Sequence, residues 1–276
     1  MTGSLKLFLP LGALLIALAL TAGAGAQSAD VTYEVKITNL TQGQPFTPPA
    51  LAAHTNQFDA YEVGQAATNE VRQIAENGDL APFVTLVSSA NGVVAHTEGT
   101  APVKGGETAT LTITAPAGSL LSWVSMLICT NDGFTGFDSV ALPASGSITV
   151  DTNAYDAGTE QNTEDFADIV PPCQALVGVT SGDAGTGASN PAITTTDVIA
   201  AHPGVQGGTD LTVAAHGWTD PVARVTITAA PGSLPSTGGP PATTDASATG
   251  FLLVVGGLMA ILGAGAMIAV SRRTSR

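Results

Sequence analysis

The first regular pattern in the chain is a strict alternation of apolar and polar side chains over residues 31–40. Val31, Tyr33, Val35 and Ile37 alternate with polar residues. A period of two with β-branched residues predicts a strand that is buried on one face. Similar strand patterns, separated by Gly, Pro, Asn and Asp, cover residues 83–88, 108–115, 119–129, 147–151, 211–215 and 223–229.

One segment between the two apolar ends of the chain has a helical period instead. In residues 66–78, Val71, Ile74 and Ala75 share one face, and Asn77-Gly78 is a helix-ending signal. Strands follow one another without the alternating helices of a parallel sheet. The pattern therefore predicts an all-β fold, an antiparallel β-sandwich with one short helix.

The N-terminal segment, residues 1–26, has the organisation of a secretory signal peptide. Lys6 precedes the apolar residues 7–20, and Ala24-Gly25-Ala26 fits a small-x-small cleavage site, so Gln27 would begin the mature protein. The alternative is an uncleaved membrane anchor. The apolar run is 14 residues long, which is short for the ~20 residues that a membrane span needs.

Residues 251–270 form a second apolar segment, with 20 residues and no charge or proline. This length predicts a transmembrane helix. Three arginines in residues 271–276 follow it, so the tail is expected in the cytoplasm and the preceding chain outside. The alternative is a buried core helix, but nothing apolar follows against which it could pack.

The part expected outside, residues 27–250, is strongly acidic. It holds all 22 acidic residues and only four basic ones, a formal net charge of −18. Such a charge argues against nucleic acid or anionic lipid as a partner and is compatible with cations.

Two cysteines, Cys129 and Cys173, are the only ones in the chain. Export to an oxidising environment makes a single disulfide the expected state, and two separate buried thiols are the alternative. The four histidines lack metal-ligand spacing, and no nucleophile elbow, phosphate loop or dinucleotide fingerprint is present. The sequence therefore predicts a protein that is not an enzyme.

Acidic residues at two strand ends are the candidates for metal binding. Asp132 follows a buried strand, and Asp156 and Glu160 are four residues apart with Gly158 between them. Ca²⁺ takes six to eight oxygen ligands, often from bent loops. Composition alone leaves the alternative of solvated charge open, since acidic loops are common in so acidic a domain.

Five segments together resemble the spondin N-terminal domain family in its bacterial form. The resemblance covers about residues 31–229. The segments, in chain order, are YEVKITNLT with GQPFTPP (33–49), IAENG (74–78), NDGFTGFDS (131–139), YDAGTE (155–160) and W with PVARVTI (218–227).

This resemblance implies a C2-like β-sandwich with a calcium ion near one end. Residue by residue, the implied ligands fall on Asp132, Asp156 and Glu160. Two departures from the family pattern are Gly133 in place of a tryptophan and Glu160 in place of a second aspartate. A family cysteine falls on Pro143, so the expected disulfide rests on this sequence alone.

Residues 231–250 have the composition of a flexible or extended stalk of Pro, Gly, Ser and Thr. Within them, Leu234-Pro235-Ser236-Thr237-Gly238 resembles the LPxTG sorting signal, which a sortase cleaves after the threonine to join the protein to the cell wall. Motif, apolar span and basic tail stand in the order of a sortase substrate, with a loose spacing of 12 residues (239–250) between motif and span. Covalent wall anchoring is therefore expected, with plain membrane tethering as the alternative.

The predicted organisation is a signal peptide (1–26), a spondin-type domain (27–230), a stalk (231–250), a transmembrane helix (251–270) and a basic tail (271–276). The predicted function is a calcium-binding adhesion or ligand-binding module on the cell surface, with an extracellular protein or glycan as ligand. A structural envelope component and a metal-dependent hydrolase are the alternatives. The step from family to adhesion is an analogy.

Overall fold

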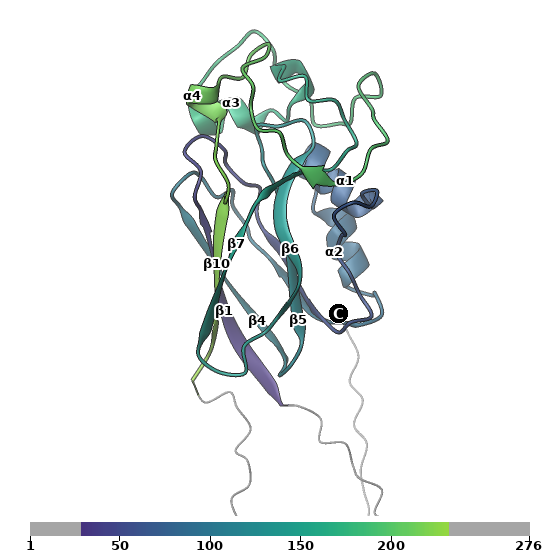
Figure 1. Ribbon diagram of the computed structural model, residues 1–276, viewed down its shortest axis with the longest axis vertical. Helices are drawn as coiled ribbons and strands as arrows, with labels where there is room; N and C mark the ends of the chain where they lie inside the picture. The colour runs from purple at the N-terminus through teal and green to yellow at the C-terminus, as the bar shows by residue number, and fades with distance from the viewer. Residues whose placement is uncertain (1–28, 232–276) are drawn as a thin grey trace, which may run out of the picture. The chain divides into compact units, whose positions relative to one another are not determined.

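Ten strands form two antiparallel sheets in residues 29–231, the part of the chain that the computed structural model describes (Figure 1). One sheet has the order β4-β1-β10-β7, with β4 (Thr108–Pro116), β1 (Asp30–Asn39), β10 (Ala223–Ala229) and β7 (Ser147–Thr152). The other has the order β3-β2-β5-β6-β8-β9, with β3 (Val93–Glu98), β2 (Ala50–His54), β5 (Leu120–Met126), β6 (Gly133–Ala141), β8 (Ala154–Asp156) and β9 (Ala200–Ala201).

The core between the sheets comes from the inward-facing residues of the alternating strands. In β1, Tyr33, Val35 and Ile37 are fully buried, and from the opposite sheet Leu121 and Trp123 join the same apolar cluster. Burying a side chain of this kind stabilises the fold by roughly 1.5–3 kcal/mol. The predicted all-β sandwich is confirmed, and the finer likeness to a C2 domain stays a prediction.

A second core lies on the other face of the six-stranded sheet, where the helices α1 (Asn69–Asn77) and α2 (Ala81–Val87) cover it (Figure 1). Ile74 and Phe83 from these helices join Val124 and Met126 of β5 in one buried cluster. Strand β5 is thus buried on both faces, which explains its continuous apolar sequence.

Helix α1 lies within the segment predicted as helical. The side chain of Thr68 accepts a hydrogen bond from the Val71 N–H and caps the start, and Gly78 ends the helix at a φ of 64°.

The prediction of one short helix is wrong, because the described part contains four short α-helices and a 3₁₀ turn. Residues 83–88, predicted as a strand, lie mostly in α2, which has Pro82 in its first turn. Residues 211–215 were also predicted as a strand. Instead, Thr212 caps the helix α4 (Val213–His216). The remaining helices are α3 (Pro172–Val177) and the 3₁₀ turn Phe166–Asp168.

The two ends of the described chain lie together at one end of the sandwich, opposite α3 and α4 (Figure 1). The Ala117 N–H donates to the Ala29 carbonyl, and the Ala230 N–H donates to the Thr32 carbonyl. The β5–β6 turn and the loop after β8 belong to the opposite end.

No helix within residues 29–231 has the length and apolar character to cross a membrane. The predicted signal peptide (1–26), the LPSTG motif (234–238), the predicted span (251–270) and the basic tail (271–276) lie outside the described residues.

Candidate metal centre

Asp132 occupies the turn between β5 and β6 and is fully buried. Its Oδ2 accepts hydrogen bonds from the Thr159 N–H (2.7 Å), the Glu160 N–H (3.0 Å) and the Thr159 hydroxyl (3.2 Å). Its Oδ1 is also buried and has no hydrogen-bond partner. A buried oxygen without a partner is costly, so Oδ1 is the atom of this site that is open to a donor or a cation.

The loop after β8 presents its backbone to Asp132 because of one glycine. Gly158 has a φ of 71°, and a Cβ at this position would lie 2.7 Å from the carbonyl carbon of Asp197. Only glycine adopts this conformation without strain. The bend directs the N–H groups of Thr159 and Glu160 toward the Asp132 carboxylate.

Glu160 is the second buried acid of the site, with 4% of its surface exposed. Its Oε1 accepts the Asn190 N–H at 2.8 Å, and the Asn190 amide donates to Asp168 Oδ1 at 2.7 Å. Asn190 therefore connects the carboxylates of Glu160 and Asp168.

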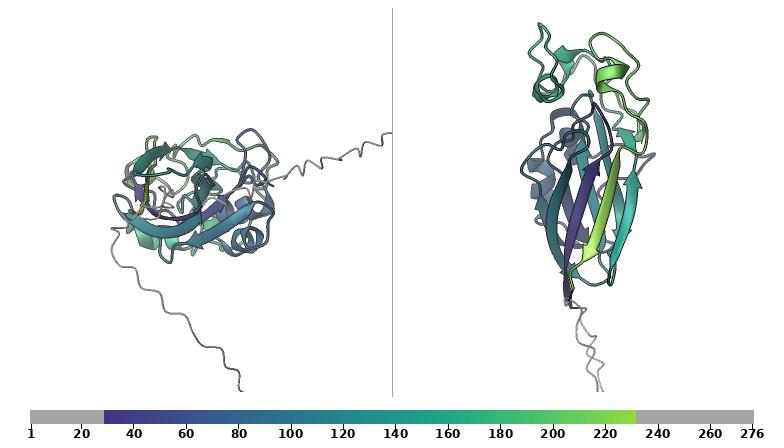
Figure 2. Two further views of the ribbon diagram at one scale, coloured as in Figure 1. Left: turned by 90° about the horizontal axis from the view of Figure 1, so that it is seen from below. Right: turned by 90° about the vertical axis from the view of Figure 1, so that its left-hand side faces the viewer.

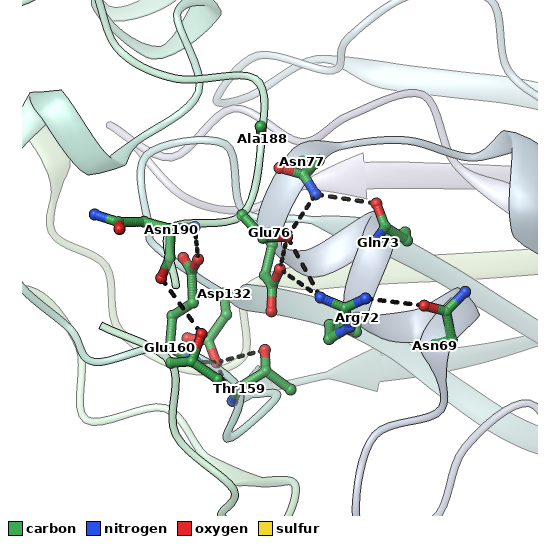
Figure 3. A network of polar contacts seen from close by, with 12 residues as sticks. Asn69, Arg72, Gln73, Glu76, Asn77, Asp132, Thr159, Glu160, Ala188 and Asn190 are labelled. Atoms are coloured by element: carbon green, nitrogen blue, oxygen red, sulfur yellow. Dashed lines mark hydrogen bonds and ion pairs between the residues drawn. The ribbon is translucent and has the colours of Figure 1, made fainter. Parts of the chain in front are cut away.

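Glu76 brings a further carboxylate from α1, and its side chain is 2% exposed. It accepts a hydrogen bond from the Ser189 hydroxyl and pairs with Arg72 at 3.3 Å. Figure 3 shows the side chains of Glu76, Asp132 and Glu160 gathered beside α1 and the loop that carries Asn190. We call Glu76, Asp132, Glu160 and Asp168 the carboxylate cluster.

The electrostatics of the cluster favour a cation. The pKa of Asp132 is raised to about 6, first by burial and then by the charge of Asp156, against the lowering effect of its hydrogen bonds. Burial also raises the pKa of Glu160 to about 7, and the charges of Glu76, Asp132 and Asp168 act in the same direction. The neighbouring charges disfavour the ionised form of Glu160, and Asp156 disfavours that of Asp132, a penalty that a bound cation would remove.

The sequence-predicted ligands are brought together only in part. The backbone N–H of Glu160 binds the Asp132 carboxylate, and the charge of Asp132 raises the pKa of the Glu160 carboxyl, so the two acids lie near each other. Asp156 is near enough to affect the pKa of Asp132, but its oxygens accept the Gly158 N–H (2.8 Å) and the Asn162 amide (2.6 Å) of its own loop. Among residues 29–231, this trio is not one of the sets whose ligand atoms all lie within 4.8 Å of one another.

Glu76 and Asp168 were missed by reasoning from sequence. Glu76 lies off the apolar face of α1 and four residues after Arg72, a spacing typical of an exposed ion pair. It is buried because the distant residue Ser189 covers it. The IAENG segment of the family resemblance, which contains Glu76, was the one signal that pointed to this position.

Two sets of three ligand atoms do lie within 4.8 Å of one another in the described part, and neither contains a member of the carboxylate cluster. Asp165, Asp183 and Asp210 are partly or fully exposed. In the second set, His216 lies beside Cys129 and Cys173, which are joined in a disulfide with an S–S distance of 2.06 Å. A disulfide offers no thiolate to a metal. The bond connects the end of β5 to α3.

Comparison with known proteins gives one assignment. No curated protein matches the chain. A family model described as Spondin_N matches residues 41–168, a stretch that contains α1, the β5–β6 turn, the loop after β8 and the whole carboxylate cluster. This match supports the spondin N-terminal family for residues 41–168.

Proposed function

We propose that this domain is a calcium-binding module for adhesion or ligand binding, displayed outside the cell and without a catalytic role. The observation that carries the proposal is the Asp132 carboxylate, fully buried with one oxygen unpartnered. Burial and the charge of Asp156 raise the pKa of Asp132, and burial with three nearby carboxylates raises the pKa of Glu160.

The donor set fits calcium better than other common metals. The groups near Asp132 are carboxylates, hydroxyls and amides, all of them oxygen ligands, with no thiolate. Ca²⁺ accepts six to eight such oxygens in flexible geometry, whereas Mg²⁺ requires a tight octahedron and keeps its waters. Asp132 and Glu160 are the residues that would hold the ion, with Glu76 and Asp168 within the same cluster. Asp156, predicted from the family resemblance, remains a candidate ligand.

A calcium ion there would join separate parts of the chain at one end of the sandwich. Glu76 belongs to α1, Asp132 to the β5–β6 turn, Glu160 to the loop after β8 and Asp168 to the 3₁₀ turn. Because the ion binds the folded state, it would stabilise these loops together. The ion's role in this proposal is structural: it fixes the surface that meets a ligand.

The position of the cluster fits display at a surface. Residues 29 and 231 lie at the end of the sandwich opposite α3 and α4 (Figure 1). If the chain is held by the predicted stalk, LPSTG motif and transmembrane segment, the cluster faces away from the envelope. The proposed location is thus the cell wall or plasma membrane, with a sortase as the processing partner.

An array of extracellular proteins and glycans tests the proposal. We expect the wild-type chain to bind a subset of spots in calcium, and to lose these spots in EDTA and in the Asp132→Asn variant. Binding to no spot under any condition would instead support a structural envelope component.

A further inference from the structure

The edge strand β4 differs from the other sheet edges of the domain. It has nine residues, of sequence TATLTITAP, with no charged side chain and no irregularity in its pairing with β1. The other edge strands are shorter, with six residues each in β3 and β7 and two in β9. Sheet edges are normally protected by charge, short length, proline or bulges, and an unprotected edge is a template for pairing.

The free hydrogen-bonding groups of β4 belong to its threonines. The Asn39 N–H donates to the Glu107 carbonyl, and the Ala117 N–H donates to the Ala29 carbonyl, at the two ends of the β1–β4 pair. In an antiparallel ladder the bonded pairs alternate, so odd-numbered residues of β4 bond to β1. The N–H and C=O groups of Thr108, Thr110, Thr112 and Thr114 therefore point to the free edge. The row of free groups ends at Pro116, which has no N–H.

The sequence of β4 is self-complementary about Thr112. In an antiparallel pair of two copies centred there, Thr112 faces Thr112 and Thr110 faces Thr114 on the outer side. On the inner side Leu111 faces Ile113, and Ala109 faces Ala115. Threonine pairs of this kind already stabilise the sheet, since Thr32 and Thr114 share a hydrogen bond at 2.9 Å and Thr38 and Thr108 share one at 2.8 Å.

Charge restricts where two copies can approach each other. Residues 29–231 contain 21 acidic and four basic side chains, a formal net charge of −17, yet none of these lies in β4. Contact through the acidic loops would place like charges together, whereas β4 itself carries no charge; Glu98 and Glu107 lie beside its first half. A groove of about 430 Å³ lies along the first half of β4 and is lined also by residues 97–103.

We infer that β4 is a homophilic interface, in which a second copy of this chain adds its own β4 edge to edge across a two-fold axis. The resulting interface is isologous, and the two four-stranded sheets become one continuous sheet. Figure 2 (right) looks onto this sheet, with β1 in purple and β10 in green at its centre.

The antiparallel arrangement decides which surfaces the pair can join. Strand β10 runs parallel to β4, because both are antiparallel to β1, and the described chain ends just after β10. In the pair, the two chain ends therefore lie at opposite ends. Copies attached through their C-terminal ends to two facing envelopes can meet this way. This step rests on the proposed adhesive function and assigns it a partner, the same protein on another cell.

Disulfide trapping tests the register. The chain has two cysteines, which are bonded to each other, so an introduced cysteine is the only free thiol. In the full-length Thr112→Cys variant, the facing Cα atoms would be about 5.5 Å apart, within disulfide range. Oxidation should give a covalent dimer. The matched Thr110→Cys variant should stay monomeric, because its copies would be about 13 Å apart along the strand. A Thr112→Cys chain that stays monomeric contradicts the register.

Sedimentation of the full-length chain in detergent tests the interface without a cross-link. We expect a dimer for the wild type and a monomer for Thr112→Lys, which places two exposed like charges opposite each other without touching the core. The control Thr149→Lys, on β7 at the other edge of the same sheet, should remain dimeric. If both lysine variants behave alike, or if the wild type is monomeric at all concentrations, the inference is wrong.

Beads coated with the full-length chain through its C-terminus test pairing between surfaces. Wild-type beads should cluster, and Thr112→Lys beads should not. A chain that dimerises in solution but never clusters beads would overturn the pairing between facing surfaces. Repeating both assays in EDTA separates this inference from the calcium proposal, since β4 contains no member of the carboxylate cluster and dimerisation should persist.

Discussion

Replacing Asp132 by asparagine removes one buried charge while keeping the size of the side chain. The amide oxygen can still accept the bonds from Thr159 and Glu160 that now reach Oδ2. The amide nitrogen then occupies the place of the unpartnered Oδ1, where a cation would otherwise bind. The substitution therefore separates metal binding from packing.

The structure gives two magnitudes for this change. In calcium at a hundred times its dissociation constant, the wild type should gain about 2.7 kcal/mol and Asp132→Asn should gain nothing. In EDTA at pH 8, the wild type carries the cost of an ionised buried acid. The difference between a pKa of about 6 and the ordinary 3.8 corresponds to about 3 kcal/mol. Without calcium, the variant should thus be more stable than the wild type, by roughly 1–3 kcal/mol after allowance for an unpaired amide N–H.

Thermal unfolding at pH 8 in EDTA, calcium and magnesium measures both effects. For a domain of this size, 1 kcal/mol shifts Tm by about 2–4 °C, so calcium should raise the wild-type Tm by about 5–11 °C. Magnesium should substitute poorly. The exposed Asp59→Asn is the matched control and should respond like the wild type.

Two results would refute this reasoning. One is an Asp132→Asn chain that keeps the wild-type calcium response. The other is a wild-type midpoint that is identical in EDTA and calcium, which would leave the carboxylates as ordinary charges of the fold.

The Asp156→Asn variant decides the role of the predicted third ligand: loss of the calcium response makes it a ligand, and retention limits the ion to the carboxylate cluster.

Four further predictions follow from the same structure. In EDTA, Asp132 and Glu160, whose pKa values are raised to about 6 and about 7, stabilise the fold at low pH, and this contribution is lost as the pH rises through those values. Tm should therefore fall from pH 5 to pH 8 in EDTA but not in saturating calcium. Reduction of the Cys129–Cys173 bond, which closes a loop of 44 residues, should cost roughly 3–4 kcal/mol in denaturant titrations, and thiol labelling of the unreduced, denatured chain should find no free thiol. Gly158→Ala should destabilise the fold by about 1–3 kcal/mol and weaken calcium binding, because its φ of 71° is strained for alanine; unchanged calorimetric affinity would count against the loop's role. Thr237→Ala should move the protein from the cell-wall fraction to the membrane fraction, whereas release of both forms by detergent alone would show that LPSTG is only stalk.

The sequence predicts all four strands of the β4-β1-β10-β7 sheet, which has one face buried and the other exposed. The alternation in β1, β4 and β10 reports this directly, because each inward position must be apolar. Strand β6 escaped prediction because its first five residues are buried on both faces and include two glycines. The short helix α2 was mistaken for a strand because its seven residues contain β-branched and aromatic side chains that suit either structure.

The candidate site was predictable in half of its members. Asp132 and Glu160 follow strands whose ends meet at one end of a sandwich, and the family resemblance pointed to both. Glu76 and Asp168 could not be inferred, because their neighbours Ser189 and Asn190 belong to a long irregular segment whose path no local pattern reveals. Asp156 was predicted as a ligand from its spacing, but in the structure its carboxylate accepts hydrogen bonds from its own loop. Spacing alone does not distinguish these two roles.

Isothermal titration of calcium into the purified full-length chain at pH 7.5 tests the central claim most directly. The account predicts one calcium ion per chain for the wild type and none for Asp132→Asn. Calcium binding to the wild type should also release protons from the two carboxyls with raised pKa values, in an amount that depends on the pH. No heat with the wild type, or equal stoichiometry in the wild type and the variant, would contradict it.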